Sequence, residues 1–149
     1  MTQTPHQNAS GLAQLQAWIA SARQPAIGET LQFTLKEVSD GRAVFEATPG
    51  RHVYNPIGSV HGGYAATLLD SACGCAVHSA LRADQAYTTL ELKVAYHRGL
   101  SADTGPILAE GKVVTMGKRV AFAEARITDA KGQLYATASS TLLVFERKA

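Results

Sequence analysis

Asp70 is the one carboxylate within a long run of small and apolar residues. Between His52 and Arg82 the sequence has this single Asp and no Glu, Lys or Arg. Burying an ionised carboxylate is costly unless a partner or a chemical role compensates for the cost. A carboxylate in such a place can attack an activated carbonyl or activate a water molecule. Asp70 is therefore the first candidate for a catalytic residue, with a structural acid bonded to the backbone or to Thr67 as the alternative.

A His-Gly-Gly triplet, His61 to Gly63, comes shortly before Asp70. If a helix begins here, the N–H groups of Gly62 and Gly63 lie where amide donors are unpaired and the helix dipole favours negative charge. Glycine also lets a carbonyl oxygen of a ligand come close. The triplet therefore predicts an oxyanion site, which together with a carboxylate suits the hydrolysis of a thioester.

The spacing between the two groups predicts an oligomer. Asp70 lies eight residues after Gly62, or roughly 12 Å along a helix at 1.5 Å per residue. One helix cannot place both groups on one thioester carbon. A second subunit that supplies the acid removes this mismatch.

The helix that carries these residues is predicted over about 59–81. The segment contains no proline and is apolar nearly all round, which is typical of a buried helix. Its many small side chains imply that other elements approach it closely. Cys73 and Cys75 are interpreted as part of this packing.

The rest of the chain predicts one helix and six strands. Residues 1–9 are expected to be a loose tail, and Ser10 to cap a helix that ends at Pro25 and Gly28. Alternation of apolar and polar residues then predicts a hairpin of two strands, the first beginning at Leu31, and four long strands after the central helix. The first long strand places Leu90, Leu92 and Val94 on one face and Thr89 on the other. Short turns between consecutive strands favour an antiparallel meander curled around the helix.

This order resembles the hotdog-fold acyl-CoA thioesterases, in particular the phenylacetic acid degradation type and the related 4-hydroxybenzoyl-CoA thioesterases. The resemblance covers about residues 28–146, and it rests mainly on the stretch from Asn55 to Gly63 followed by Leu68-Leu69-Asp70. It implies an α+β hotdog fold in which a six-stranded antiparallel sheet wraps the central helix. Residues 1–27 are then an N-terminal tail and helix, and residues 28–149 a single thioesterase domain.

The resemblance also implies roles for individual residues. Gly62 corresponds to the oxyanion donor and Asp70 to the nucleophile or general base, while Asn55 is placed near the thioester carbonyl or the water. Thr89, or its neighbour Thr88, matches a hydroxyl that holds the water. Related 4-hydroxybenzoyl enzymes carry that hydroxyl one helical turn after the acid, where this chain has Gly74. The alternative for Asn55 is a turn residue, and the alternative for Thr89 is a solvated hydroxyl. His61 is expected to orient the loop rather than act as base.

The substrate is expected to be an acyl-CoA, with either an aryl or a medium-chain acyl group. Gly63 is a further candidate for substrate binding. Arg98, Lys118 and Arg119 are candidates for the phosphates of coenzyme A, although charged turn residues are often merely solvated. The histidines show no metal-ligand spacing, and no cofactor is expected because coenzyme A is part of the substrate. The predicted assembly is a homodimer or homotetramer with active sites at the subunit interface.

Composition restricts the class of protein further. A hydrophobic content of 46% and a charged content of 17% are typical of a globular domain. The net charge of +2 is too weak to suggest nucleic-acid binding. No signal peptide is visible, and the most apolar stretch is interrupted by Asp70 and His78, so a cytoplasmic protein without a membrane span is expected.

Two other functions stay open: an acyl-CoA hydratase or dehydratase that uses His61 as its acid or base, and a non-catalytic acyl-CoA binding module.

Overall fold

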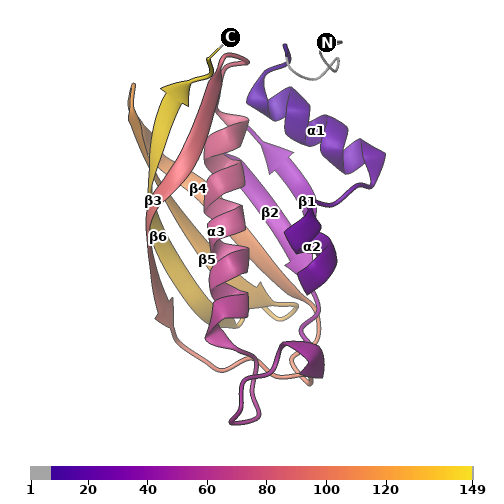
Figure 1. The fold of residues 1–149 in the computed structure, drawn as a ribbon. Helices are drawn as coiled ribbons and strands as arrows, with labels where there is room; N and C mark the ends of the chain where they lie inside the picture. Colours follow the sequence, from indigo (N-terminus) through magenta and orange to yellow (C-terminus); the bar gives the residue numbers. More distant parts are fainter. Residues whose placement is uncertain (1–7, 149) are drawn as a thin grey trace.

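The computed structural model of the protein describes residues 8–148. A six-stranded antiparallel sheet curls around one long helix, α3 (Figure 1). The helices are α1 (Gly11–Ser21), α2 (Ala26–Leu31) and α3 (Gly62–Ser79), with a short 3₁₀ turn, η1, at Arg51–Val53. The strands are β1 (Phe33–Ser39), β2 (Arg42–Ala47), β3 (Gln85–Tyr96), β4 (Ile107–Met116), β5 (Val120–Asp129) and β6 (Leu134–Glu146).

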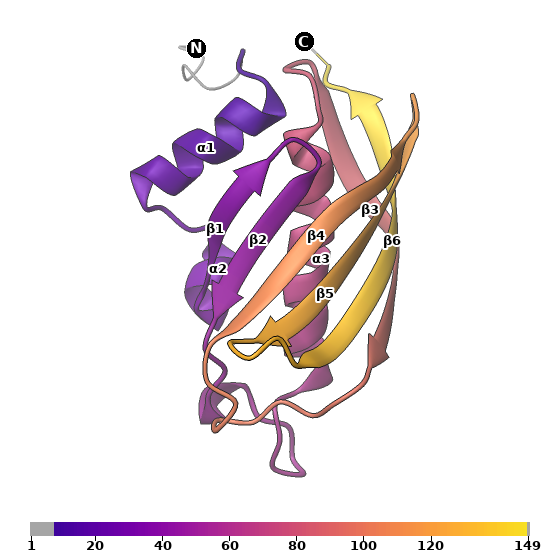
Figure 2. The same ribbon diagram turned by 180° about the vertical axis from the view of Figure 1, so that it is seen from behind.

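Helix α3 is the core of the molecule. It lies against one face of the sheet, and the view from behind shows the strands in front of it (Figure 2). Eleven of its 18 residues are buried. The predicted fold is therefore confirmed, with a shorter helix than the expected 59–81. Residues 59 and 60 are not helical because the His61 side chain caps the helix and Val60 forms a bridge with Tyr54.

The small residues of α3 allow close approach of the backbone of β4. A Cβ atom added to Gly111 would lie 2.2 Å from the Ala72 carbonyl oxygen, so only glycine fits where β4 crosses the helix. Cys73 and Cys75 are free and buried, and burial raises the pKa of each thiol to about 12. They pack in the core, as the sequence predicted.

The strand order corrects the predicted meander. Within residues 8–148 the sheet runs β1-β2-β4-β5-β6-β3, so of the four strands after α3 only β4, β5 and β6 are neighbours in sequence order. Strand β3 pairs with β6 at the edge instead of with β4. The connection 97–106 returns the chain from this edge to the middle of the sheet, and it is held on the way by a hydrogen bond from Val60 N–H to the Leu100 carbonyl.

The N-terminal part also differs in one element. Ser10 caps α1 as predicted, through a hydrogen bond from Ala13 N–H to its hydroxyl. Leu31, however, ends the short helix α2 and does not begin a strand; β1 begins at Phe33. Helix α1 packs against α3 and β1 through its buried Leu15. The predicted loose tail, residues 1–9, lies almost entirely outside the described residues. Among the helices of residues 8–148, none is long and apolar enough to cross a membrane.

Candidate active site

Asp70 lies in the middle of α3, half-buried and facing β3. Its Oδ1 atom accepts a hydrogen bond from the Thr89 hydroxyl at 2.9 Å. No Lys, Arg or His of residues 8–148 forms an ion pair with it. The carboxylate is thus held in position by a neutral donor, which leaves its negative charge available for chemistry.

A β-bulge in β3 brings Thr89 to Asp70. The pairing of β3 with β6 shifts register between Thr89 and Glu91, so Leu90 has no partner. Leu92 and Val94 pack against the core, whereas the side chain of Leu90 is 58% exposed. The predicted face of Leu90, Leu92 and Val94 is therefore wrong at Leu90, because the extra residue reverses the alternation.

The same bulge separates the two candidate threonines. Thr89 reaches the helix side of the sheet, and Thr88, next along the strand, is exposed. Successive side chains of a strand point to opposite faces. Of the two hydroxyls that the sequence offered, the structure brings only that of Thr89 to Asp70.

The His61-Gly62-Gly63 triplet forms the first turn of α3. His61 Nδ1 accepts the Gly63 N–H at 2.8 Å, so this N–H is used by the helix cap. The Gly62 N–H makes no hydrogen bond within residues 8–148. One of the two predicted amide donors is therefore free. The His61 side chain thus bonds a backbone N–H of the helix cap.

A cavity of about 220 Å³ opens beside this turn. Gly62, Ala65, Tyr96, Arg98 and Leu100 are among the residues that line it. Asp70 and Thr89 are not among them, although they belong to the same helix and strand. Within one chain, Gly62 thus lines a cavity that Asp70 does not line.

The Asn55 side chain is engaged in its own turn. Its Oδ1 atom accepts the N–H groups of Ile57 and Ser59, each at 3.1 Å, and its amide donates to the Ser59 hydroxyl at 3.1 Å. These bonds fix the loop 55–59 that leads into the helix cap. The structure describes the turn role that the sequence left open, and the catalytic role of Asn55 stays a prediction.

The candidate phosphate-binding cations do not come together in one chain. Arg98 lines the cavity beside Gly62. Lys118 and Arg119 line a separate cavity of about 510 Å³, together with Arg82 and Gln85, which follow the C-terminal end of α3. The two groups therefore lie at different cavities of the molecule.

Two tyrosines of β3, Tyr87 and Tyr96, contact the site helix, and neither contact was predicted. A Cβ atom at Gly74 would lie 2.7 Å from the Tyr87 hydroxyl, which explains why no side chain occupies that position one turn after Asp70. The Tyr96 hydroxyl donates a hydrogen bond to the Gly62 carbonyl at 2.6 Å. The partners are far apart in sequence, so no local pattern indicates either contact.

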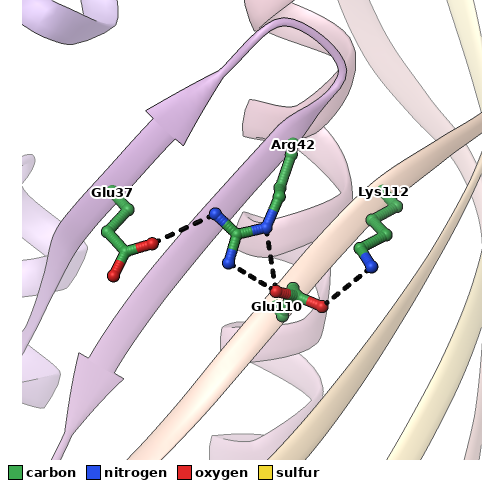
Figure 3. Close-up of polar contacts among 4 residues, drawn as sticks. All are labelled: Glu37, Arg42, Glu110 and Lys112. Carbon is green, nitrogen blue, oxygen red and sulfur yellow. Dashed lines mark hydrogen bonds and ion pairs between the residues drawn. The ribbon is translucent and has the colours of Figure 1, made fainter.

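The other face of the sheet carries paired charges instead. Because Gly111 faces α3, its neighbours Glu110 and Lys112 point away from the helix. Arg42 bridges Glu110 at 2.6 Å and Glu37 at 3.0 Å, and Lys112 lies 3.3 Å from Glu110 (Figure 3). The hydrogen bonds that Arg42 donates to these carboxylates raise its pKa. These charges neutralise one another, in contrast to the unpaired charge of Asp70.

Comparison with known proteins gives consistent matches. A sequence profile described as "Thioesterase superfamily" matches residues 57–136, more than half of the chain. A 1,4-dihydroxy-2-naphthoyl-CoA hydrolase of Listeria monocytogenes is 26% identical over 120 residues, which cover 80% of this chain and 96% of that enzyme. A protein of Halobacterium salinarum assigned as an esterase is 45% identical over 69 residues. That match covers 45% of this chain and 44% of the relative, less than half of its length.

The structure is also similar to solved structures. The PaaI protein from the phenylacetic acid degradation operon of E. coli superimposes with a TM-score of 0.76. It is 21% identical in sequence, and the match covers 91% of this chain and 93% of that protein. At this level of identity the likeness shows a shared fold.

Proposed function

This chain belongs to the thioesterase superfamily, as the sequence predicted, and from that premise we propose that it hydrolyses an acyl-CoA thioester to a carboxylic acid and free coenzyme A. Two features of α3 carry the proposal. Asp70 has no cationic partner among residues 8–148, and the N–H of Gly62, at the start of the same helix, has no hydrogen-bond partner among them. The relative from Listeria, named as a hydrolase of an aryl-CoA thioester, supports coenzyme A as the leaving group.

In the proposed mechanism the Gly62 N–H donates a hydrogen bond to the thioester carbonyl oxygen and stabilises the negative charge that develops there. Asp70 either attacks the carbonyl carbon or removes a proton from the attacking water. The carbon–sulfur bond then breaks, and the coenzyme A thiolate leaves and takes up a proton. Thr89 keeps the carboxylate of Asp70 oriented through its hydrogen bond.

The site is proposed to form between two copies of the chain. Gly62 and Asp70 are roughly 12 Å apart along α3, and Gly62 lines a cavity that Asp70 does not line. The two edges of the sheet also differ: β1 is flanked by α1 and α2 (Figure 1), whereas β3 pairs only with β6. A 12-residue edge strand with unpaired N–H and C=O groups is a template for pairing with another strand. We assign the dimer contact to β3, next to Asp70.

Supporting roles are proposed for the other candidates. Asn55 and His61 hold the loop and helix cap that present the Gly62 N–H. Arg98 lies at the same cavity, and Lys118 and Arg119, from either copy, supply positive charge for the phosphates of coenzyme A. The reaction as proposed requires no cofactor besides the substrate itself.

The hydratase alternative is disfavoured by the hydrogen bonding of His61. Its Nδ1 lone pair accepts the Gly63 N–H, so the neutral ring carries its proton on Nε2. Neither nitrogen is then free to accept a proton from a substrate unless the helix cap opens. His61→Ala should therefore reduce turnover less than Asp70→Ala does, whereas a hydratase would show equal losses.

The direct test is release of the coenzyme A thiol from a panel of aryl and aliphatic acyl-CoA esters. We expect turnover of at least one ester and a loss of roughly a thousandfold in kcat for Asp70→Asn. Asp103→Asn, an exposed acid of the loop between β3 and β4, is the matched control and should keep normal turnover. Normal hydrolysis by Asp70→Asn contradicts the assignment of the acid. Tight binding of acyl-CoA esters without any turnover supports the binding-module alternative.

A further inference from the structure

Tyr96, the last residue of β3, contacts the helix turn that carries the proposed oxyanion donor. Its hydroxyl donates to the Gly62 carbonyl at 2.6 Å, across 34 residues of sequence. Its ring lies against the Gly62 backbone, because a Cβ atom added there would be 3.0 Å from the hydroxyl oxygen and 3.1 Å from Cζ. Tyr96 and Gly62 also line the same cavity of about 220 Å³.

This contact is not explained by core packing. The Tyr96 side chain is 56% exposed, so its ring buries little area compared with the tyrosines of the core. The Gly62 carbonyl belongs to the first turn of α3, where it already has a helical partner available, and a carbonyl can accept a second hydrogen bond. The contact therefore acts locally, on the conformation of the first turn.

The first turn is the part of α3 that most needs an external restraint. It begins with two glycines, the residues with the greatest backbone freedom, and helix ends fray more readily than helix centres. His61 Nδ1 holds the turn from one side through the Gly63 N–H, and Tyr96 holds it from the other through the Gly62 carbonyl. Between these two restraints the Gly62 N–H has no hydrogen-bond partner among residues 8–148.

We propose that Tyr96 is a positioning residue that fixes the first turn of α3, so that the Gly62 N–H is oriented toward the thioester carbonyl before the substrate binds. This inference rests on the proposed function of Gly62. An oriented donor stabilises the transition state without reorganisation during the reaction, whereas a mobile one must be ordered at that moment. One strand then supports the half-sites that the chain contributes to two active sites, through Thr89 at Asp70 and Tyr96 at Gly62.

The test compares Tyr96→Phe with the matched control Thr141→Val. Tyr96→Phe keeps the ring and removes the hydroxyl, and Thr141→Val removes a hydroxyl that bonds Glu91 of the same strand at 2.9 Å, on the other face. We expect kcat of Tyr96→Phe to fall roughly tenfold, less than for loss of the donor itself. The dissociation constant of an S-alkyl coenzyme A thioether, which lacks the carbonyl, should not change. An unchanged kcat, or weaker thioether binding in step with kcat, overturns the proposal.

Amide hydrogen exchange provides a readout that does not depend on activity. In Tyr96→Phe the amides of Gly63 and Tyr64, which bond to His61 in the first turn, should exchange faster than in the wild type. Thr141→Val should leave their exchange unchanged. Equal exchange rates in Tyr96→Phe and the wild type overturn the positioning role, even if no acyl-CoA is hydrolysed and the proposed function itself fails.

Discussion

The Thr89 hydroxyl donates a hydrogen bond to Asp70 Oδ1 at 2.9 Å, and it does so beside the bulge that shifts the register of β3. If Leu90 were paired and β3 had no bulge, strict alternation from Leu92 and Val94 would turn Thr89 away from α3. The bulge is therefore the local feature that links the edge strand to the carboxylate of the helix.

The first prediction concerns this hydrogen bond. Thr89→Val keeps the shape of the side chain and removes the donor, so the Asp70 carboxylate loses its fixed orientation. Since hydrogen bonds to charged groups contribute about 1.5–3 kcal/mol, we expect kcat for acyl-CoA hydrolysis to fall roughly ten- to hundredfold. Thr88→Val discriminates between the two candidate hydroxyls in the same thiol-release assay, and a larger loss there than at Thr89 would assign the water-holding role to Thr88.

A second prediction isolates the Gly62 N–H. Gly62 is the first residue of α3, a position that tolerates proline, and the preceding His61 has the extended backbone that proline requires. Gly62→Pro removes the donor, and Gly62→Ala keeps it while adding the same Cβ atom next to Tyr96. We expect kcat to fall roughly a hundred- to thousandfold for Gly62→Pro, and far less for Gly62→Ala. Similar kcat values for the two variants would exclude this N–H as the oxyanion donor.

The shared site predicts complementation between inactive chains. When Asp70→Asn and Gly62→Pro chains are co-expressed, about half of randomly formed dimers contain one of each, and one of their two sites is intact. We therefore expect recovery of roughly a quarter of the wild-type rate. Each variant expressed alone provides the baseline. If the mixed dimer, purified with two different tags, has no more activity than the single variants, the two groups act within one chain.

Close approach of β4 to α3 predicts a loss of stability for Gly111→Ala. The new Cβ atom would lie 2.2 Å from the Ala72 carbonyl oxygen, and the atoms that it meets belong to the backbone of α3, which cannot move aside as a flexible side chain can. We expect the free energy of unfolding, measured in urea, to fall by about 1–3 kcal/mol. Gly99→Ala, whose Cβ atom would meet nothing within 4 Å, is the control and should unfold as the wild type does. Equal stability of both variants would mean that β4 can move away from the helix.

Acid is predicted to lower the stability of the fold through His78 of α3. His78 Nε2 lies 3.0 Å from Gln14 Oε1, and burial, with a contribution from the positive charge of Arg147, lowers the pKa of His78. The unfolded chain therefore takes up a proton first as pH falls below about 6.5, and the free energy of unfolding decreases. Above that pH this contribution to stability is fully present. Urea unfolding across this range should show the decrease in the wild type and a smaller one in His78→Gln; identical pH profiles would exclude His78 as the cause.

The sequence by itself determined the elements and the chemical candidates. The apolar run around Asp70 predicts a buried helix, because only a helix enclosed by other elements needs no polar face. Period-two alternation predicts the long strands, and the His-Gly-Gly triplet with a later acid indicates the family. These signals are local, since each depends on residues within a few turns or one strand.

The tertiary structure decided which candidates meet. Strand order is set by packing of whole elements, so β3 lies beside β6 although β4 follows it in sequence. A single unpaired residue, Leu90, reverses the facing of Thr89, and no composition rule marks it in advance. The restraint of Gly62 by Tyr96 likewise depends on two segments that meet only after the sheet has closed around α3. Contacts between distant residues depend on the packed fold, which is why the identities of the site residues could be predicted but their partners could not.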